Sequence, residues 1–132
     1  MREILFRGKR IDNGELVEGF LLKECNYATC SWNLAIEYKT DRFGKFAYDV
    51  AEIIPESISE FVGLTDKNGK KIFEGDIVRY MNKETMVVVW NNDSASFAIA
   101  YSAINFNYLA TISSAHIYLE VIGNIHDNPE LL

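Results

Sequence analysis

Cysteine and proline are scarce in this sequence, with two of each in 132 residues, and long hydrophobic runs are missing. Two cysteines cannot build the disulfide framework of a small secreted domain, and no second pair or nearby histidine completes a four-ligand zinc site. No window approaches the roughly 18 consecutive apolar residues of a membrane-spanning helix, and the first residues lack the apolar stretch of a signal peptide. The sequence therefore predicts a cytoplasmic protein with no membrane association.

The two cysteines, Cys25 and Cys30, lie close together in the chain. A hairpin that brings them side by side would allow a disulfide. In a chain without an export signal, however, we expect reduced thiols that pack as small apolar groups. The sequence alone leaves the choice open.

Basic charge is also scarce, because 13 Lys and Arg stand against 19 Asp and Glu, which gives a net charge of −6. Residues 1–50 carry eight of each sign, so the whole acidic excess lies in residues 51–132. This balance disfavours a broad phosphate-binding surface. The local basic groups are Arg7, Lys9 and Arg10, and then Lys67, Lys70 and Lys71. Both groups flank predicted turns, where charge commonly keeps a hairpin tip in water.

Apolar and aromatic residues are plentiful: 48% of the chain is hydrophobic and 13% aromatic, which is the composition of an ordinary folded domain. These residues alternate with polar ones, and β-branched and aromatic types dominate between the turn signals, as in half-buried strands. Asn13-Gly14 tolerates the positive φ angles of a tight hairpin turn. The predicted hairpins join residues 4–11 to 16–22, 34–38 to 46–50, and 86–90 to 97–101, and a last strand covers 118–125.

The predicted fold is mainly β, with short antiparallel hairpins and at most one short helix, which helical spacing permits between residues 105 and 116. Pro55 ends the first strand pattern, because proline lacks the N–H group that a β-ladder needs. After it, dense turn signals bracket a very short strand at residues 70–73, a rhythm typical of a small SH3-like barrel. We therefore expect an N-terminal β-hairpin region over 1–54 and an SH3-like barrel region over 55–132, joined in one compact unit.

Three blocks of the sequence read MREILFR at residues 1–7, FVGLTDKNGKKIFEGDIV at 61–78 and EVIGNIHDNPEL at 120–131. In this order they resemble the YopX family of phage and prophage proteins, and His126 departs from an aromatic position of the family pattern. The resemblance implies a small, mainly β protein of bacteriophage or prophage origin in the cytoplasm of the bacterial host. It carries over no established biochemical role and no catalytic residues. The motif positions, which we expect to be structural, are Gly63, Asp66, Asn68, Gly69, Glu74, Gly75, Asp76, Gly123, Asn124, Asn128 and Pro129.

Four oxygen-bearing side chains of the central block superficially resemble a calcium loop: Asp66, Asn68, Glu74 and Asp76. Their spacing does not fit, because a strand-like segment separates two turns and the loop does not lie between helices. We expect Asp66 and Asn68 to cap their own backbone, and the glycines at 69 and 75 to adopt conformations that other residues resist. The sequence predicts no metal and no other cofactor.

The sequence offers few residues for catalysis. His116 and His126 are its only imidazoles, and the spacing pairs neither of them with Cys25 as a nucleophile. The central glycines precede no helix that would direct its N-terminus at a phosphate. We therefore predict that the protein is not an enzyme.

The predicted function is non-enzymatic and depends on protein–protein contacts, including self-association, with a partner that the sequence does not identify. Edge strands such as Leu34–Tyr38, and a tail that ends in Leu131 and Leu132, would dock onto a neighbouring subunit. The alternative is a nucleic-acid-binding barrel, in which exposed aromatic rings stack on bases beside Arg7, Lys9 or Arg10. The aromatic candidates are Trp32, Tyr38, Phe43, Tyr48, Trp90, Phe97 and Tyr101, although alternating aromatics on strands more commonly form a core.

Overall fold

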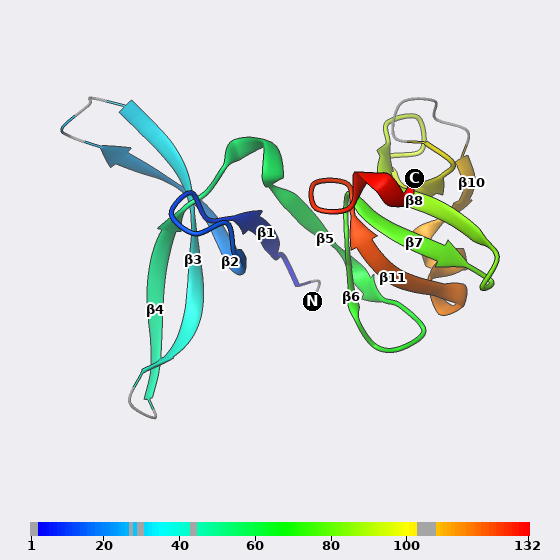
Figure 1. Cartoon of the computed structure of the whole chain (residues 1–132), viewed down its shortest axis with the longest axis horizontal. Helices are drawn as coiled ribbons and strands as arrows, with labels where there is room; N and C mark the ends of the chain where they lie inside the picture. The colour runs from blue at the N-terminus through cyan, green and yellow to red at the C-terminus, as the bar shows by residue number, and fades with distance from the viewer. Residues whose placement is uncertain (1–2, 27, 29–30, 43–44, 103–107) are drawn as a thin grey trace. The chain divides into compact units, whose positions relative to one another are not determined.

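Figure 1 shows the computed structural model of the chain, which describes residues 3–26, 28, 31–42, 45–102 and 108–132. The chain is mainly β, as predicted, and its strands are antiparallel. It divides into two compact units, Met1–Glu60 and Phe61–Leu132, and each is described by itself. In the described residues, no helix has the length and apolar character needed to cross a bilayer.

Unit 1 is an antiparallel sheet in the strand order β4-β3-β2-β1-β5. Its strands are β1 (Phe6–Lys9), β2 (Leu16–Asn26), β3 (Ser31–Arg42), β4 (Lys45–Glu52) and the first two residues of β5 (Ser59–Thr65), and a 3₁₀ turn, η1, covers Pro55–Ser57. Gly14 has a φ of +72° in the turn between β1 and β2, where Asn13 accepts a hydrogen bond from the backbone of Glu15. The first two predicted hairpins are therefore confirmed, and β2 also pairs with β3.

The inner face of this sheet carries a small apolar core. Ile36, Ala51 and Ile53 are buried, and Phe6, Val17, Leu21, Tyr38 and Ile58 pack against them. At Gly19 the backbone of β2 lies very close to that of β3, because a Cβ atom placed there would collide with the backbone oxygen of Glu37. The sequence of β2 therefore needs a residue without a side chain at this point.

The prediction that Leu34–Tyr38 forms an edge strand is wrong. These residues belong to β3, which pairs with β2 on one side and with β4 on the other. Ile36 lies opposite Leu21 in β2 and opposite Ala51 in β4. The end strand of the sheet is β4, the second strand of the predicted hairpin.

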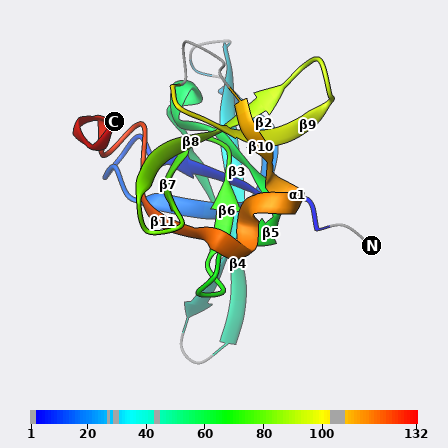
Figure 2. The same ribbon diagram turned by 90° about the vertical axis from the view of Figure 1, so that its right-hand side faces the viewer.

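Unit 2 contains the rest of β5 and a five-stranded sheet in the order β10-β9-β8-β7-β11. Its elements are β6 (Lys71–Phe73), β7 (Asp76–Tyr80), β8 (Glu84–Asn91), β9 (Ser96–Ala100), β10 (Tyr108–Thr111), α1 (Ile112–Ala115), β11 (Leu119–Asn124), and the 3₁₀ turns η2 (His116–Tyr118) and η3 (Pro129–Leu131). In Figure 2 this unit faces the viewer, and its strands curve strongly. Met86–Val89 is buried on both faces of the sheet, as its continuous apolar run predicts, whereas Trp90 is exposed.

The helix predicted between residues 105 and 116 is shorter than its apolar spacing indicates. Leu109 and Ala110 belong to β10, which pairs with β9, so that the backbone ladder overrides the helical pattern. The helix is one turn, Ile112–Ala115. Phe106 lies outside the described residues. In the part of the chain that the structure describes, α1 is the one α-helix, in agreement with the prediction of at most one.

Candidate functional site

The central motif residue Asp66 is a structural support of unit 2. Its buried carboxylate accepts the backbone N–H groups of Asn68 and Lys70 at Oδ1, each at 2.9 Å. Its Oδ2 accepts the N–H group of Val121 in β11, also at 2.9 Å. The predicted capping role is confirmed for Asp66, and the same side chain also ties the β5–β6 turn to the last strand. Asn68 is exposed in that turn.

The other positions of the central block shape the turn between β6 and β7. Asp76 is fully buried, and its Oδ2 accepts the N–H group of Phe73 at 2.8 Å. Gly75 has a φ of +85° and donates its N–H group to the oxygen of Val88. Glu74 beside it is half-buried, and Gly63 and Gly69 also have positive φ. Among the described residues, no three His, Cys, Asp or Glu side chains gather as metal ligands.

The closing block folds around Asn124. Its side-chain oxygen accepts the N–H groups of His126 and Asp127, and the Asn128 side-chain oxygen accepts the N–H group of Asn124. A Cβ atom at Gly123 would lie 2.6 Å from that Asn128 oxygen, so any side chain there would displace the Asn128 amide. Pro129 opens η3 directly afterwards. These motif positions serve the fold of unit 2.

The two histidines occupy ordinary places. Nδ1 of His116 lies 2.9 Å from the backbone oxygen of Thr65, and His126 is exposed after β11. Cys25 is half-buried in β2 of unit 1, and Cys30 lies outside the described residues. The expectation that both thiols are reduced therefore stays a prediction. Cys25 belongs to unit 1, and both histidines belong to unit 2.

The basic residues Arg7, Lys9 and Arg10 do not share one exposed surface. Arg7 is buried in β1, and the backbone of Lys9 donates to Ser57 Oγ at 2.8 Å. The Arg10 guanidinium binds both carboxylate oxygens of Asp12, at 2.9 and 2.7 Å. The hydrogen bonds from Arg10 hold the pKa of Asp12 below its ordinary value, and Asp12 in turn raises the pKa of Arg10. The geometry therefore does not gather these groups for phosphate binding.

The aromatic candidates for base stacking are also dispersed. Tyr38 is half-buried in the unit 1 core, and its hydroxyl oxygen accepts a hydrogen bond from Arg10 Nη1 at 2.7 Å. Trp90 stacks edge-on against Phe97, and a hydrogen bond with Glu84 raises the pKa of the exposed Tyr101. The side chains of Trp32 and Phe43 lie outside the described residues.

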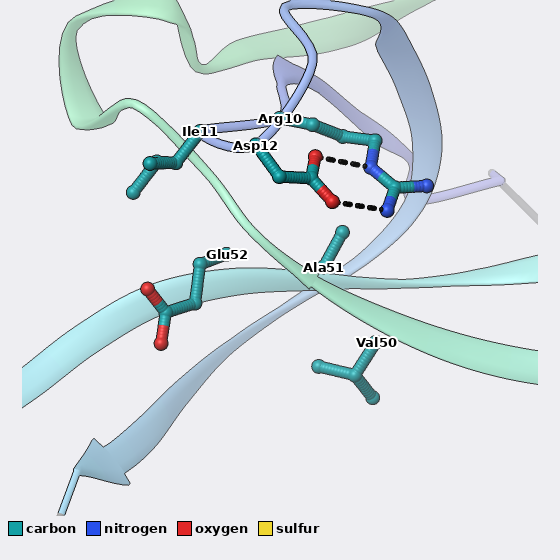
Figure 3. Close-up of a pocket in the computed structure, with 6 residues that line it drawn as sticks. All are labelled: Arg10, Ile11, Asp12, Val50, Ala51 and Glu52. Carbon is teal, nitrogen blue, oxygen red and sulfur yellow. Dashed lines mark hydrogen bonds and ion pairs between the residues drawn. The ribbon is translucent and has the colours of Figure 1, made fainter.

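A hollow opens in unit 1 beside the end strand β4. It has a volume of about 240 Å³ and is lined by Arg10, Ile11, Asp12, Val50, Ala51 and Glu52 (Figure 3). The N–H group of Ile11 donates to the backbone oxygen of Glu52 at 3.0 Å, which holds the loop against the end of the strand. Figure 3 shows the Arg10–Asp12 pair on one side of the hollow and the Glu52 carboxylate on the other.

The outer face of the unit 1 sheet continues from this hollow and exposes large apolar side chains. Residues directly opposite each other on neighbouring strands share a face, so Phe20, Glu37 and Val50 form one row across β2, β3 and β4. Tyr48, two residues before Val50, lies on the same face. Phe20 and Tyr48 are each 60% exposed, and Val50 is 46% exposed. We call Phe20, Glu37, Tyr48, Val50 and Glu52 the open face.

The sequence pattern left open whether Tyr48 lies in the core or is exposed, and it did not single out Phe20. Both faces of β2 and β4 carry apolar residues, so a period of two shows that a strand has two faces without showing which one is covered. The covered face is fixed by Ile36 and Ile53 of other segments, which pack on Ala51. The signal in the sequence is the charged Glu37 between Ile36 and Tyr38, which favours exposure of the face that Glu37 shares.

The chain matches the model of the YopX protein family over residues 5–132. No curated protein matches it. Among solved structures, it is similar to the crystal structure of protein EF1440 from Enterococcus faecalis, with a TM-score of 0.60 and 22% sequence identity over 100% of this chain and 99% of that one. At this identity the likeness concerns the fold alone.

Proposed function

The chain belongs to the YopX family, and on that premise we propose that it is a phage- or prophage-encoded accessory protein that acts through protein–protein contacts, including self-association, and not as an enzyme. The observation that supports this proposal most is the open face. It presents three large apolar side chains on one face of the sheet, next to a strand that ends the sheet. Exposed apolar surface of this kind is typical of protein contact sites.

The contribution of the open face to the free energy of association follows from its exposed apolar area. About half of each of the three apolar side chains remains in water, and burying that half contributes about 1 kcal/mol per side chain. Their sum, about 3 kcal/mol, corresponds to roughly a hundredfold in the dissociation constant. Because association also costs several kcal/mol of translational and rotational freedom, we expect the contact to be lost when these side chains are removed.

The test is sedimentation velocity over a series of protein concentrations. We expect the wild type to form an oligomer that the triple variant Phe20→Ser, Tyr48→Ser, Val50→Thr does not form. The control is Leu109→Ser, which removes a comparably exposed apolar side chain from β10 in unit 2. A wild type that stays monomeric at every concentration, or a triple variant that associates as the wild type does, would contradict the proposal.

A further inference from the structure

The charges of unit 2 indicate what the open face binds. We infer that the open face of one copy docks onto a basic, apolar end of unit 2 in a second copy. We call this surface the lysine end and define it by Lys67, Met81, Lys83, Ile117 and Tyr118. The inference rests on the proposed self-association and names the surface that receives the open face.

Basic charge in the second part of the chain is confined to a few neighbouring segments. All five basic residues after position 50 lie in or beside the β5–β6 turn and the β7–β8 hairpin: Lys67, Lys70, Lys71, Arg79 and Lys83. The two turns meet, because Lys67 Nζ donates to Asn82 Oδ1 at 2.7 Å. Their backbones also donate hydrogen bonds to the junction of η2 and β11, from Lys67 to Leu119 and from Met81 to Tyr118. Figure 1 shows these segments at one end of the unit.

The lysine end exposes apolar side chains among its charges. Met81 is 51% exposed, Ile117 57% and Tyr118 45%. The ring of Tyr80 packs edge-on against that of Tyr118, with 6.3 Å between the ring centroids. Met81 has a φ of +51°, in the left-handed region where glycine or asparagine relieves the strain. The tip of the hairpin thus has a methionine at a backbone position that glycine or asparagine would adopt more easily. The flexible side chain of methionine adapts well to a partner surface.

The two surfaces are complementary in charge. The open face has Glu37 between Phe20 and Val50 and Glu52 at its margin, and it also carries the basic Lys39 opposite Tyr48. Among the described residues, no basic side chain pairs with Glu37. Two open faces would bring carboxylates together, and two lysine ends would bring ammonium groups together, which like-charge repulsion disfavours. Glu37 and Glu52 meet Lys67 and Lys83 when the open face of one copy contacts the lysine end of another, in a head-to-tail arrangement, although the exposed Glu84 follows Lys83 directly.

A nucleic acid is the less favoured occupant of the lysine end. Single-stranded nucleic acids bind to several exposed aromatic rings beside a track of basic groups. Here Tyr118 is the aromatic member, and Met81 and Ile117 are aliphatic, so the surface suits apolar side chains better than stacked bases.

The test is a charge-swap experiment with two double variants, Lys67→Glu with Lys83→Glu and Glu37→Lys with Glu52→Lys. Each reverses the charge of one surface, and we expect each alone to associate at least about tenfold more weakly than the wild type. An equimolar mixture presents acidic and basic surfaces to each other again, so sedimentation should recover the oligomer. Circular dichroism and thermal melting establish that both variants are folded.

The outcomes separate this inference from the proposed function. If the wild type associates and the lysine variant associates equally well, the head-to-tail contact is wrong, while the proposal that the open face is a contact surface is unaffected. If the mixture fails to recover association that both variants lost, the two surfaces do not meet. A wild type without self-association overturns both proposals. Binding of a fluorescein-labelled single-stranded DNA of about twelve nucleotides that the lysine variant abolishes, with self-association unchanged, assigns the lysine end to nucleic acid and overturns the inference.

Discussion

Replacing Asp66 by Ala should destabilise unit 2 by about 2–5 kcal/mol. The carboxylate accepts three backbone N–H groups, from Asn68, Lys70 and Val121. Two of these lie in an exposed turn, where water takes over part of the lost hydrogen bonding. The Val121 donor is in β11 and partly buried, and an orphaned donor of this kind costs about 1–3 kcal/mol. The loss of charge-assisted bonds to the turn contributes the rest.

The assay is equilibrium urea unfolding followed by fluorescence, with the m-value as a check that the cooperative unit is unchanged. Since a domain of this size is stable by about 5–15 kcal/mol, the variant should remain folded at 25 °C with a clearly lower midpoint. The matched control is Asn68→Ala in the same turn, which keeps the backbone donor and should change stability by less than about 0.5 kcal/mol. A decrease in the free energy of unfolding below about 1 kcal/mol for Asp66→Ala would refute the reasoning, because the hydrogen bond to Val121 would then not stabilise the fold.

Three further predictions concern unit 1 and the tail. Gly19→Ala should cost about 3 kcal/mol or more in urea unfolding, because the new Cβ would meet the backbone oxygen of Glu37; a neutral result would contradict the close approach. Asp12, whose pKa Arg10 lowers, should stabilise the fold above its ordinary pKa of 3.8 and lose this contribution as the pH falls through the lowered pKa, so Asp12→Asn should flatten the pH dependence of unfolding stability below pH 3.8. The double variant Leu131→Ser, Leu132→Ser replaces two exposed side chains and should weaken the oligomer. An unchanged sedimentation profile would count against a role for the tail.

Local chemistry in the sequence predicts the hairpins, and the strand order depends on contacts that no local pattern contains. Gly14 takes the positive φ that Asn13-Gly14 indicates, and Asp66 caps the turn that follows it. The bond from Val121 to Asp66 spans 55 positions, which no turn rule predicts. Likewise, Leu34–Tyr38 was expected to be an edge strand, yet β3 pairs on both sides, because β2 extends beyond its pairing with β1 and pairs with β3 over residues 20–26.

The candidate site was less accessible to sequence reasoning than the fold. The motif positions of unit 2 were expected to be structural, and their contacts through Asp76 and Asn124 support the fold. The open face lies in a region without motifs, where alternation alone does not tell the covered side of a sheet from the exposed one. Exposure of Phe20 and Tyr48 becomes visible only when the core around Ile36 is in place.

The most direct test of the central claim is the sedimentation of the wild type beside the Phe20→Ser, Tyr48→Ser, Val50→Thr variant as protein concentration is raised. Our account predicts that the sedimentation coefficient of the wild type rises with concentration while that of the folded variant stays at the monomer value. Equal behaviour of the two proteins, whether both associate or both remain monomeric, would contradict the claim that the open face is a contact surface.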